Sequence, residues 1–278
     1  MQFGVNTLLW TAAFDRSHLH LLPPIKDAGF DGVEIARFDF AGFPAAELRR
    51  ETEALGLQPI FCSALTGNAS IITDDTAVRS RSLAFLKDGI QVAAELGAHT
   101  FIGPYLSAVG LLHGRRRTAD EWKRAVEGLQ SLGDTLTSCG VTLAVEPLNR
   151  FECYSLNTAA DAVALCDAVG HPNVGILYDT FHGHIEEKQT GDAIRRSGKH
   201  LKHVHTCEND RGVPGSGQVH WDEVFPALKD AGYDGWLVIE SFGQNVPEIA
   251  AAACIWRDLA PSPEAIMLGG LEFLKARV

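Results

Sequence analysis

Four side chains that can bind a metal ion each stand near the end of a short apolar segment in the second half of the sequence. They are Glu146 in "VTLAVEPL", Asp179 in "ILYDTFHGH", His205 in "KHVHTCEND" and Glu240 in "LVIESFG". Apolar runs of this length are typical of buried strands, where an uncompensated charged group costs several kcal/mol. Four such groups on four successive segments therefore predict a shared cation.

Three carboxylates and one imidazole form an oxygen-rich set of ligands. This set favours Mn²⁺ or Mg²⁺, with Co²⁺ as a further candidate, whereas a structural zinc ion would prefer thiolates. His203 lies on the same face of its strand as His205, so spacing alone leaves both as candidate ligands. The residues thus predict a hard divalent metal centre and leave its histidine open.

The elements that would position these side chains can be counted along the chain. Eight strand-like segments begin at residues 3, 32, 59, 99, 141, 174, 201 and 236. Helical patterns lie between them, and several end in glycine, where a left-handed C-cap would fall; examples begin at Ala45, Ser82, Glu121 and Trp221, and the tail from Pro261 reads as a last helix.

Alternating strands and helices at about 30 residues per unit are typical of βαβ connections. Eight units predict an α/β fold, a (β/α)8 TIM barrel that forms a single domain over residues 1–278. A doubly wound open sheet usually has a glycine-rich turn after its first strand, and none follows "FGVNTLLW". In a barrel, active sites lie at the C-terminal ends of the strands, where the four side chains are predicted.

The composition excludes several classes of partner. The chain has 35 acidic and 24 basic residues and a formal charge of -11, which would repel a phosphate backbone, so we expect no nucleic acid partner. No apolar run reaches the roughly 18 residues of a membrane span, and the N-terminus lacks a signal-peptide pattern. The six cysteines are scattered without a C-x-x-C pair and are predicted to be reduced. We therefore expect a cytoplasmic protein with no membrane partner.

Four stretches, "VEPLNRFECYSLNTAADA", "LYDTFHGHIEE", "HVHTCENDRGVPGSGQVHW" and "VIESF", carry a resemblance to a known family. Through them the sequence resembles the ketose 3-epimerases, the D-tagatose, D-psicose and L-ribulose 3-epimerase group of the xylose isomerase-like barrels. The resemblance is dense from Val141 to Gly243 and loose before it. It implies a homodimer or homotetramer that acts on a ketose.

The resemblance also implies roles for individual residues. The metal ligands of the family fall on Glu146, Asp179, His205 and Glu240, which selects His205 over His203. Glu152, His182 and Arg211 are implied to hold the oxygens near the carbonyl end of the sugar. A salt bridge from Glu152 to Arg150 or to a neighbouring helix is the alternative for the first of these.

Epimerisation of a ketose at carbon 3 requires removal of a proton beside the carbonyl and its return on the opposite face. We expect Glu146 and Glu240 to act as the base and the conjugate acid on the two faces of a cis-enediolate, while the metal polarises the oxygens. The far end of the sugar would be contacted by residues that follow the first four strands; the candidates are Asn6, Trp10, Ser63, Leu65, Pro104 and Tyr105. A free sugar is favoured over a sugar phosphate, because no phosphate-binding glycine loop is evident near the last strands.

Three alternatives remain at this point. A sugar isomerase, a hydroxypyruvate isomerase or an inosose dehydratase would use similar ligands for related enediol chemistry. An abasic-site endonuclease on the same fold would need a histidine-rich zinc cluster and a basic surface, and a sugar-binding barrel without catalysis would need no acid and base.

Overall fold

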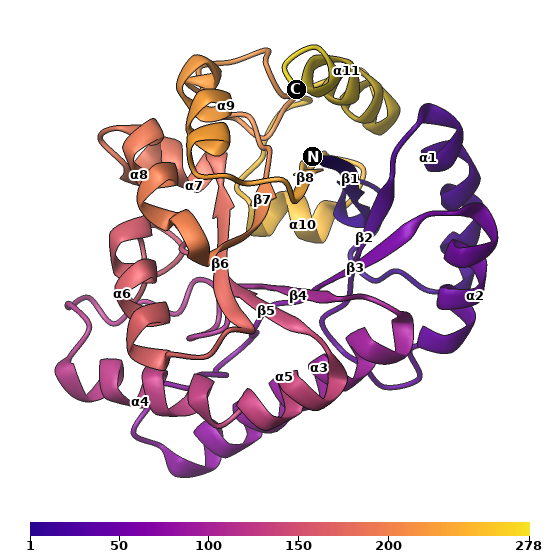
Figure 1. Ribbon diagram of the computed structural model, residues 1–278. Helices are drawn as coiled ribbons and strands as arrows, with labels where there is room; N and C mark the ends of the chain where they lie inside the picture. Colours follow the sequence, from indigo (N-terminus) through magenta and orange to yellow (C-terminus); the bar gives the residue numbers. More distant parts are fainter.

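Eight parallel strands form a closed barrel at the centre of the computed structural model, which describes residues 1–278 (Figure 1). The strands pair in chain order, and the ring closes where Phe3 of β1 lies opposite Leu237 of β8. Their bounds are β1 Gln2–Asn6, β2 Gly32–Ala36, β3 Gln58–Cys62, β4 Thr100–Gly103, β5 Thr142–Val145, β6 Val174–Asp179, β7 Leu201–His205 and β8 Trp236–Ile239. The predicted (β/α)8 TIM barrel is confirmed, and the predicted strand starts agree with the observed ones to within one residue.

Helices surround the barrel and join its strands (Figure 1). They are α1 Leu22–Ala28, α2 Ala45–Leu55, α3 Thr76–Leu96, α4 Ala119–Gln130, α5 Gly133–Cys139, α6 Ala159–Val169, α7 Thr180–Glu186, α8 Thr190–Ser197, α9 Trp221–Asp230, α10 Pro247–Ala252 and α11 Pro263–Lys275, with short 3-10 turns at η1 Thr7–Leu9, η2 Arg16–Leu21 and η3 Gly198–His200. Gly56 and Gly97 end α2 and α3 in the left-handed conformation, as the sequence predicts.

Two helix boundaries differ from the prediction, and local side chains explain both. Helix α3 begins six residues before Ser82, because the Asp75 carboxylate accepts hydrogen bonds from the first free N–H groups of the helix. The predicted helix from Glu121 is divided into α4 and α5. At the break the Ser131 hydroxyl donates to the Gly128 carbonyl at 2.7 Å, which is the kind of local bond that competes with a continuing helix.

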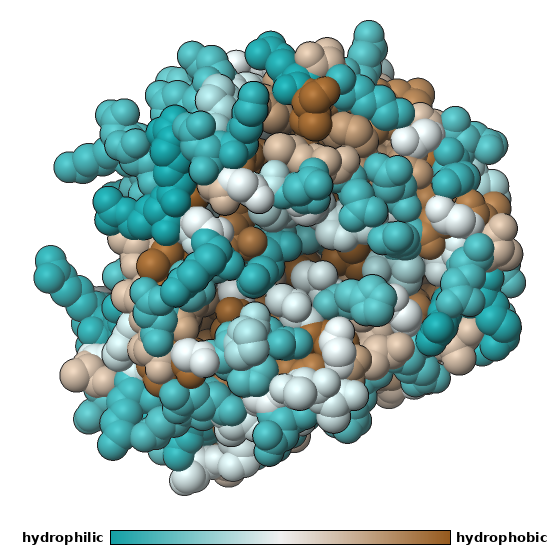
Figure 2. Space-filling model, viewed as in Figure 1, coloured by the Kyte–Doolittle hydropathy of each residue, from teal (hydrophilic) through white to brown (hydrophobic).

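The core has two parts that follow the alternation of side chains along the strands. A cluster of 11 buried residues, among them Ile60, Ile102, Leu177 and Val238, has members from most of the strands of the barrel. A larger cluster of 56 buried residues includes the apolar faces of the helices. The outer helices present mostly hydrophilic side chains (Figure 2), and no helix combines the length and hydropathy that a membrane crossing requires.

Candidate metal centre

The four predicted ligands converge at the C-terminal ends of the last four strands. Asp179 and His205 are the last residues of β6 and β7, and Glu146 and Glu240 directly follow β5 and β8. All four are buried, with at most 7% of any of them exposed. Parallel strands of one barrel end at the same rim, so the strand positions predicted from sequence are sufficient to bring the side chains together.

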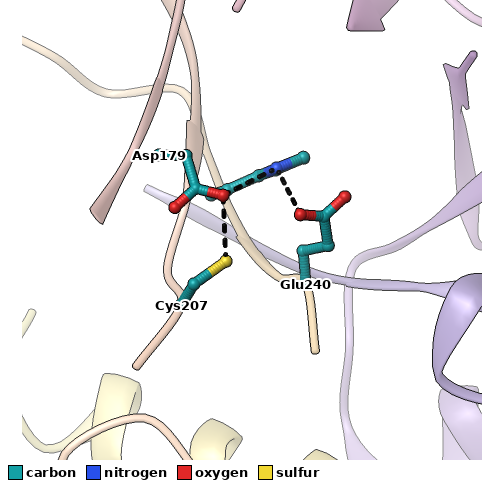
Figure 3. A group of neighbouring side chains, drawn as sticks. Asp179, Cys207 and Glu240 are labelled. Atoms are coloured by element: carbon teal, nitrogen blue, oxygen red, sulfur yellow. Dashed lines mark hydrogen bonds and ion pairs between the residues drawn. The ribbon is translucent and has the colours of Figure 1, made fainter. Parts of the chain in front are cut away.

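The His205 ring lies at the centre of this group. Its Nδ1 atom is 3.4 Å from Glu240 Oε2, 3.7 Å from Asp179 Oδ2 and 3.9 Å from Glu146 Oε1. Atoms that share a small divalent cation at about 2.1 Å lie roughly 3.0 to 4.2 Å apart. Figure 3 shows the Asp179 and Glu240 carboxylates pointing toward one another and toward the same space. The three distances from His205 Nδ1 fall in this range. Asp179, His205 and Glu240 form one group of mutually close ligand atoms together with Cys207, and Glu146 forms a second group with Asp179 and His182.

Two buried atoms of the four predicted ligands have no hydrogen-bond partner. They are His205 Nδ1 and Glu146 Oε1, and both face the shared space between the carboxylates. Buried polar atoms are rarely left without a partner, since each costs about 1 to 3 kcal/mol. A divalent cation would satisfy both atoms, and three carboxylates with one imidazole suit Mn²⁺ or Mg²⁺. The residues present fit the metal that the sequence predicts.

Burial and neighbouring charges displace the pKa values of these groups in opposite directions. Burial is the main cause that raises the pKa of Glu146 well above its usual value, and the negative charge of the Glu240 carboxylate is the second. Burial would also raise the pKa of Asp179, but Arg211 and the nearby histidines hold it well below its usual range. The pKa of His205 is raised, because the attraction of Glu240 and Glu34 outweighs its burial. The cluster is thus rich in negative charge and attracts cations.

Arg211 is the one guanidinium inside the cluster. Its Nη1 atom donates to Asp179 at 2.9 Å and to Glu240 at 3.0 Å, and its planar head lies 4.0 Å from the ring centre of Phe181 and 4.8 Å from that of Phe242. Arg211 also has a positive φ of 66°. The conformation is held by its loop, where the Glu208 carboxylate accepts from the backbone and side-chain N–H groups of Gly215, Val219 and Trp221.

His182 and Glu152 lie beside this arginine and share a partner, Asn149. The Nδ1 atom of His182 accepts from the backbone N–H of Asn149 at 3.1 Å, and its Nε2 atom lies 3.1 Å from Arg211 Nη2 and 3.6 Å from Glu146 Oε1. Burial lowers the pKa of His182 to about 3, which keeps the ring neutral. Glu152 accepts from the Asn149 amide at 2.7 Å, and Arg150 pairs with Glu186 at 2.9 Å. The alternative of a salt bridge from Glu152 to Arg150 is therefore wrong.

The candidates from the first half of the barrel occupy different places. The Asn6 amide donates to Glu34 at 2.6 Å and to Glu240 at 3.4 Å, and the indole N–H of Trp10 donates to Glu264 at 3.1 Å. Leu65 and Tyr105 are fully buried in the larger cluster that includes the helix faces, Tyr105 against Phe101. Both follow the ends of their strands, β3 and β4, and their role toward a sugar stays a prediction.

Two residues of the cluster were missed by sequence reasoning. Glu34 in β2 is completely buried, with its carboxylate 2.9 Å from His205 Nε2 and 2.8 Å from His203 Nε2. Cys207 places its sulfur 3.2 Å from Asp179 Oδ2 (Figure 3). The signal for Glu34 was present in "GVEIA", where a single carboxylate interrupts an otherwise apolar strand, the same argument that identifies Glu146.

Comparison with known proteins agrees with the fold and the resemblance. Residues 22–277 match the family described as xylose isomerase-like TIM barrel. The chain is 38% identical to a probable ketose 3-epimerase of Synechocystis sp. over 99% of this chain and 96% of the relative. It is 33% identical to a D-psicose 3-epimerase of Agrobacterium fabrum, over 94% of this chain and 91% of the relative. A solved L-ribulose 3-epimerase superposes with a TM-score of 0.94 at 31% identity, covering 99% of this chain and 93% of the other.

Proposed function

We propose that this chain, which belongs to the ketose 3-epimerases of the xylose isomerase-like TIM barrel family, interconverts two free ketoses that differ in configuration at carbon 3. Membership of this group makes it an isomerase. The convergence of four buried ligand-type side chains at one rim is the observation that carries the metal-dependent form of this proposal.

Glu146, Asp179, His205 and Glu240 would hold the divalent cation, with Mn²⁺ as the first candidate. When bound, the cation would act as a Lewis acid that polarises the ketose carbonyl and offsets the negative charge of the deprotonated sugar. The two unpartnered buried atoms, His205 Nδ1 and Glu146 Oε1, support this assignment.

Glu146 and Glu240 are proposed as the acid and base pair. One carboxylate takes the proton from carbon 3, which leaves a flat cis-enediolate, and the carboxylic acid of the other returns a proton to carbon 3 on the opposite face. Their roles exchange when the reaction runs backward. The two residues follow β5 and β8, on either side of the ligands from β6 and β7, which supports an approach from two sides.

Three further residues would bind the oxygens of carbons 1 to 3. Arg211 and His182 would donate hydrogen bonds to these oxygens, and the Glu152 carboxylate would accept one from a hydroxyl. Fixed donors of this kind contribute a few kcal/mol each when charge develops on oxygen. For the far end of the sugar we keep Asn6 and Trp10 as the candidates from the first half of the barrel.

A ketose panel tests the proposal. The Mn²⁺-loaded protein is incubated in turn with D-fructose, D-tagatose and L-ribulose, and the products are separated by chromatography. We expect the carbon 3 epimer of at least one ketose and incorporation of deuterium at carbon 3 in deuterated water. Aldose products would favour an isomerase. Cleavage of abasic DNA without sugar turnover would favour an endonuclease. Absence of deuterium exchange at carbon 3 with every metal tested would favour a sugar-binding barrel. Sedimentation of the same sample tests the predicted homodimer or homotetramer.

A further inference from the structure

Glu34 is the one carboxylate that the first four strands place inside the cluster of predicted ligands. It is the third residue of β2, a strand that is buried along its whole length, and its side chain is completely buried. A buried carboxylate is costly unless charges or hydrogen bonds compensate for it. Its contacts therefore indicate what it does.

Both oxygens of Glu34 are engaged by side chains of other strands. Oε1 lies 2.9 Å from His205 Nε2 and accepts from the Asn6 amide at 2.6 Å. Oε2 lies 2.8 Å from His203 Nε2, and the two atoms are not aligned as a hydrogen bond. The Asn6 amide also reaches Glu240 Oε1 at 3.4 Å. Glu34 thus connects β2 to two of the four predicted ligands, His205 directly and Glu240 through Asn6.

The bond to His205 decides which ring nitrogen can bind a metal. Because Oε1 accepts from Nε2, the neutral ring carries its proton on Nε2 and has its lone pair on Nδ1, the atom that faces Asp179 and Glu240. A carboxylate behind a metal-binding histidine fixes the orientation of the ring and makes it a stronger ligand.

These short contacts also argue against a second metal ion between Glu34 and the two histidines. Ligands of a tetrahedral zinc ion at about 2.0 Å would lie roughly 3.3 Å apart. The two observed distances of 2.8 and 2.9 Å are shorter and match direct contact. Glu34 is therefore close enough to contact both rings directly, and its Oε1 is hydrogen-bonded to His205.

We propose that Glu34 is a positioning residue for the metal centre, which fixes His205 directly and Glu240 through Asn6. This inference rests on the proposed function, because it assumes that the two residues are ligands. It assigns to β2 a role that neither the resemblance nor the spacing of the motifs indicated.

The test is Mn²⁺ affinity of the metal-free chain, measured by calorimetry without sugar. Glu34→Gln keeps the shape of the side chain and removes its charge, and we expect the Kd for Mn²⁺ to rise 10- to 100-fold. At saturating Mn²⁺ the epimerase turnover should recover at least in part. The matched control is Glu121→Gln, which removes another buried carboxylate that contacts Arg115, Thr118 and Tyr154 and no member of the cluster. It should leave the Kd unchanged.

The outcomes separate the two proposals. If the unmodified chain binds no divalent metal, the metal-dependent proposal fails first. If the unmodified chain binds Mn²⁺ and epimerises a ketose while Glu34→Gln binds Mn²⁺ equally well, only the proposed role of Glu34 is overturned. A lower Tm of Glu34→Gln in that case would show that the Glu34–His205 contact serves the stability of the fold alone. Should Glu34→Gln not fold, Asn6→Ala leaves the Glu34–His205 contact in place and removes the amide bonds to Glu34 and Glu240, together with the bond that Asn6 accepts from the Leu8 N–H. A several-fold weaker Kd in that variant supports the inference, and an unchanged Kd contradicts it.

Discussion

The two halves of the barrel supply different side chains to the same rim. Strands β1 to β4 end in Asn6, Ala36, Cys62 and Gly103, none of which is a carboxylate or an imidazole. Strands β5 to β8 end in, or are directly followed by, Glu146, Asp179, His205 and Glu240. Charge is thus concentrated in the half that would bind the metal and the reacting carbons.

This division explains where the sequence resembles its family. The resemblance is dense between Val141 and Gly243, where the proposed shared cation would restrict both the type and the distance of each ligand. The first half packs mainly neutral side chains, which many sequences can supply, and the loops after its strands would contact the far end of the sugar. Glu34 is the exception, since it lies in the neutral half and contacts the charged one.

The strongest test of this comparison removes the acid and base of the charged half. We expect Glu146→Gln and Glu240→Gln each to reduce epimerisation at carbon 3 about 10³-fold, because a positioned acid or base contributes this much to proton transfer. Formation of the carbon 3 epimer followed by NMR at saturating Mn²⁺ is the measurement, with Glu121→Gln as the control. Activity above one tenth of wild type in both variants would rule out the two-carboxylate scheme.

Arg211→Lys is expected to have the next largest effect. Lysine keeps the charge but lacks the planar fork that contacts Asp179 and Glu240 and packs between two aromatic rings. We predict a loss of about 100-fold in kcat/KM, corresponding to the few kcal/mol of a fixed donor. Steady-state kinetics with the best ketose measure it. An unchanged kcat/KM would mean that Arg211 serves the structure of its loop and not the sugar.

The fold and the charged half of the site were predictable from sequence for a physical reason. The strand-end position fixes where Glu146, Asp179, His205 and Glu240 meet, whichever helices surround the barrel. Spacing could not choose between His203 and His205, because residues two apart share one strand face, and both rings do contact Glu34. The start of α3 and the break between α4 and α5 depend on single side chains, Asp75 and Ser131, that a periodic pattern does not reveal.

A carboxylate outside the cluster should affect stability alone. Glu121 accepts from Arg115 at 2.8 Å and closes a capping box with Thr118, so we expect Glu121→Gln to cost about 2 kcal/mol of unfolding free energy and no activity. The Arg115 hydrogen bond, outweighing partial burial, lowers the pKa of Glu121 from 4.5 to about 2. Its contribution is therefore present above pH 4.5 and is lost as the pH falls toward 2. Urea unfolding of both proteins at several pH values checks this. A stability difference between wild type and Glu121→Gln that grows as the pH falls would contradict it.

Glu152→Gln should give the smallest change, of the opposite sign. Burial raises the pKa of Glu152 above 4.5, so its ionisation disfavours the folded state. The variant should match the stability of the wild type below pH 4.5 and exceed it as the pH rises through the raised pKa. Thermal melts from pH 4 to 8 measure the difference. A variant that is less stable than the wild type at pH 8 would show that the Glu152 carboxylate is stabilising in its ionised form.

The central claim is that one divalent cation is bound by Glu146, Asp179, His205 and Glu240. An anomalous difference map from crystals of the Mn²⁺-loaded protein tests it most directly. The account predicts a single strong peak within about 2.3 Å of an atom of each of the four residues. A peak elsewhere, or no peak among these side chains at saturating Mn²⁺, would contradict it.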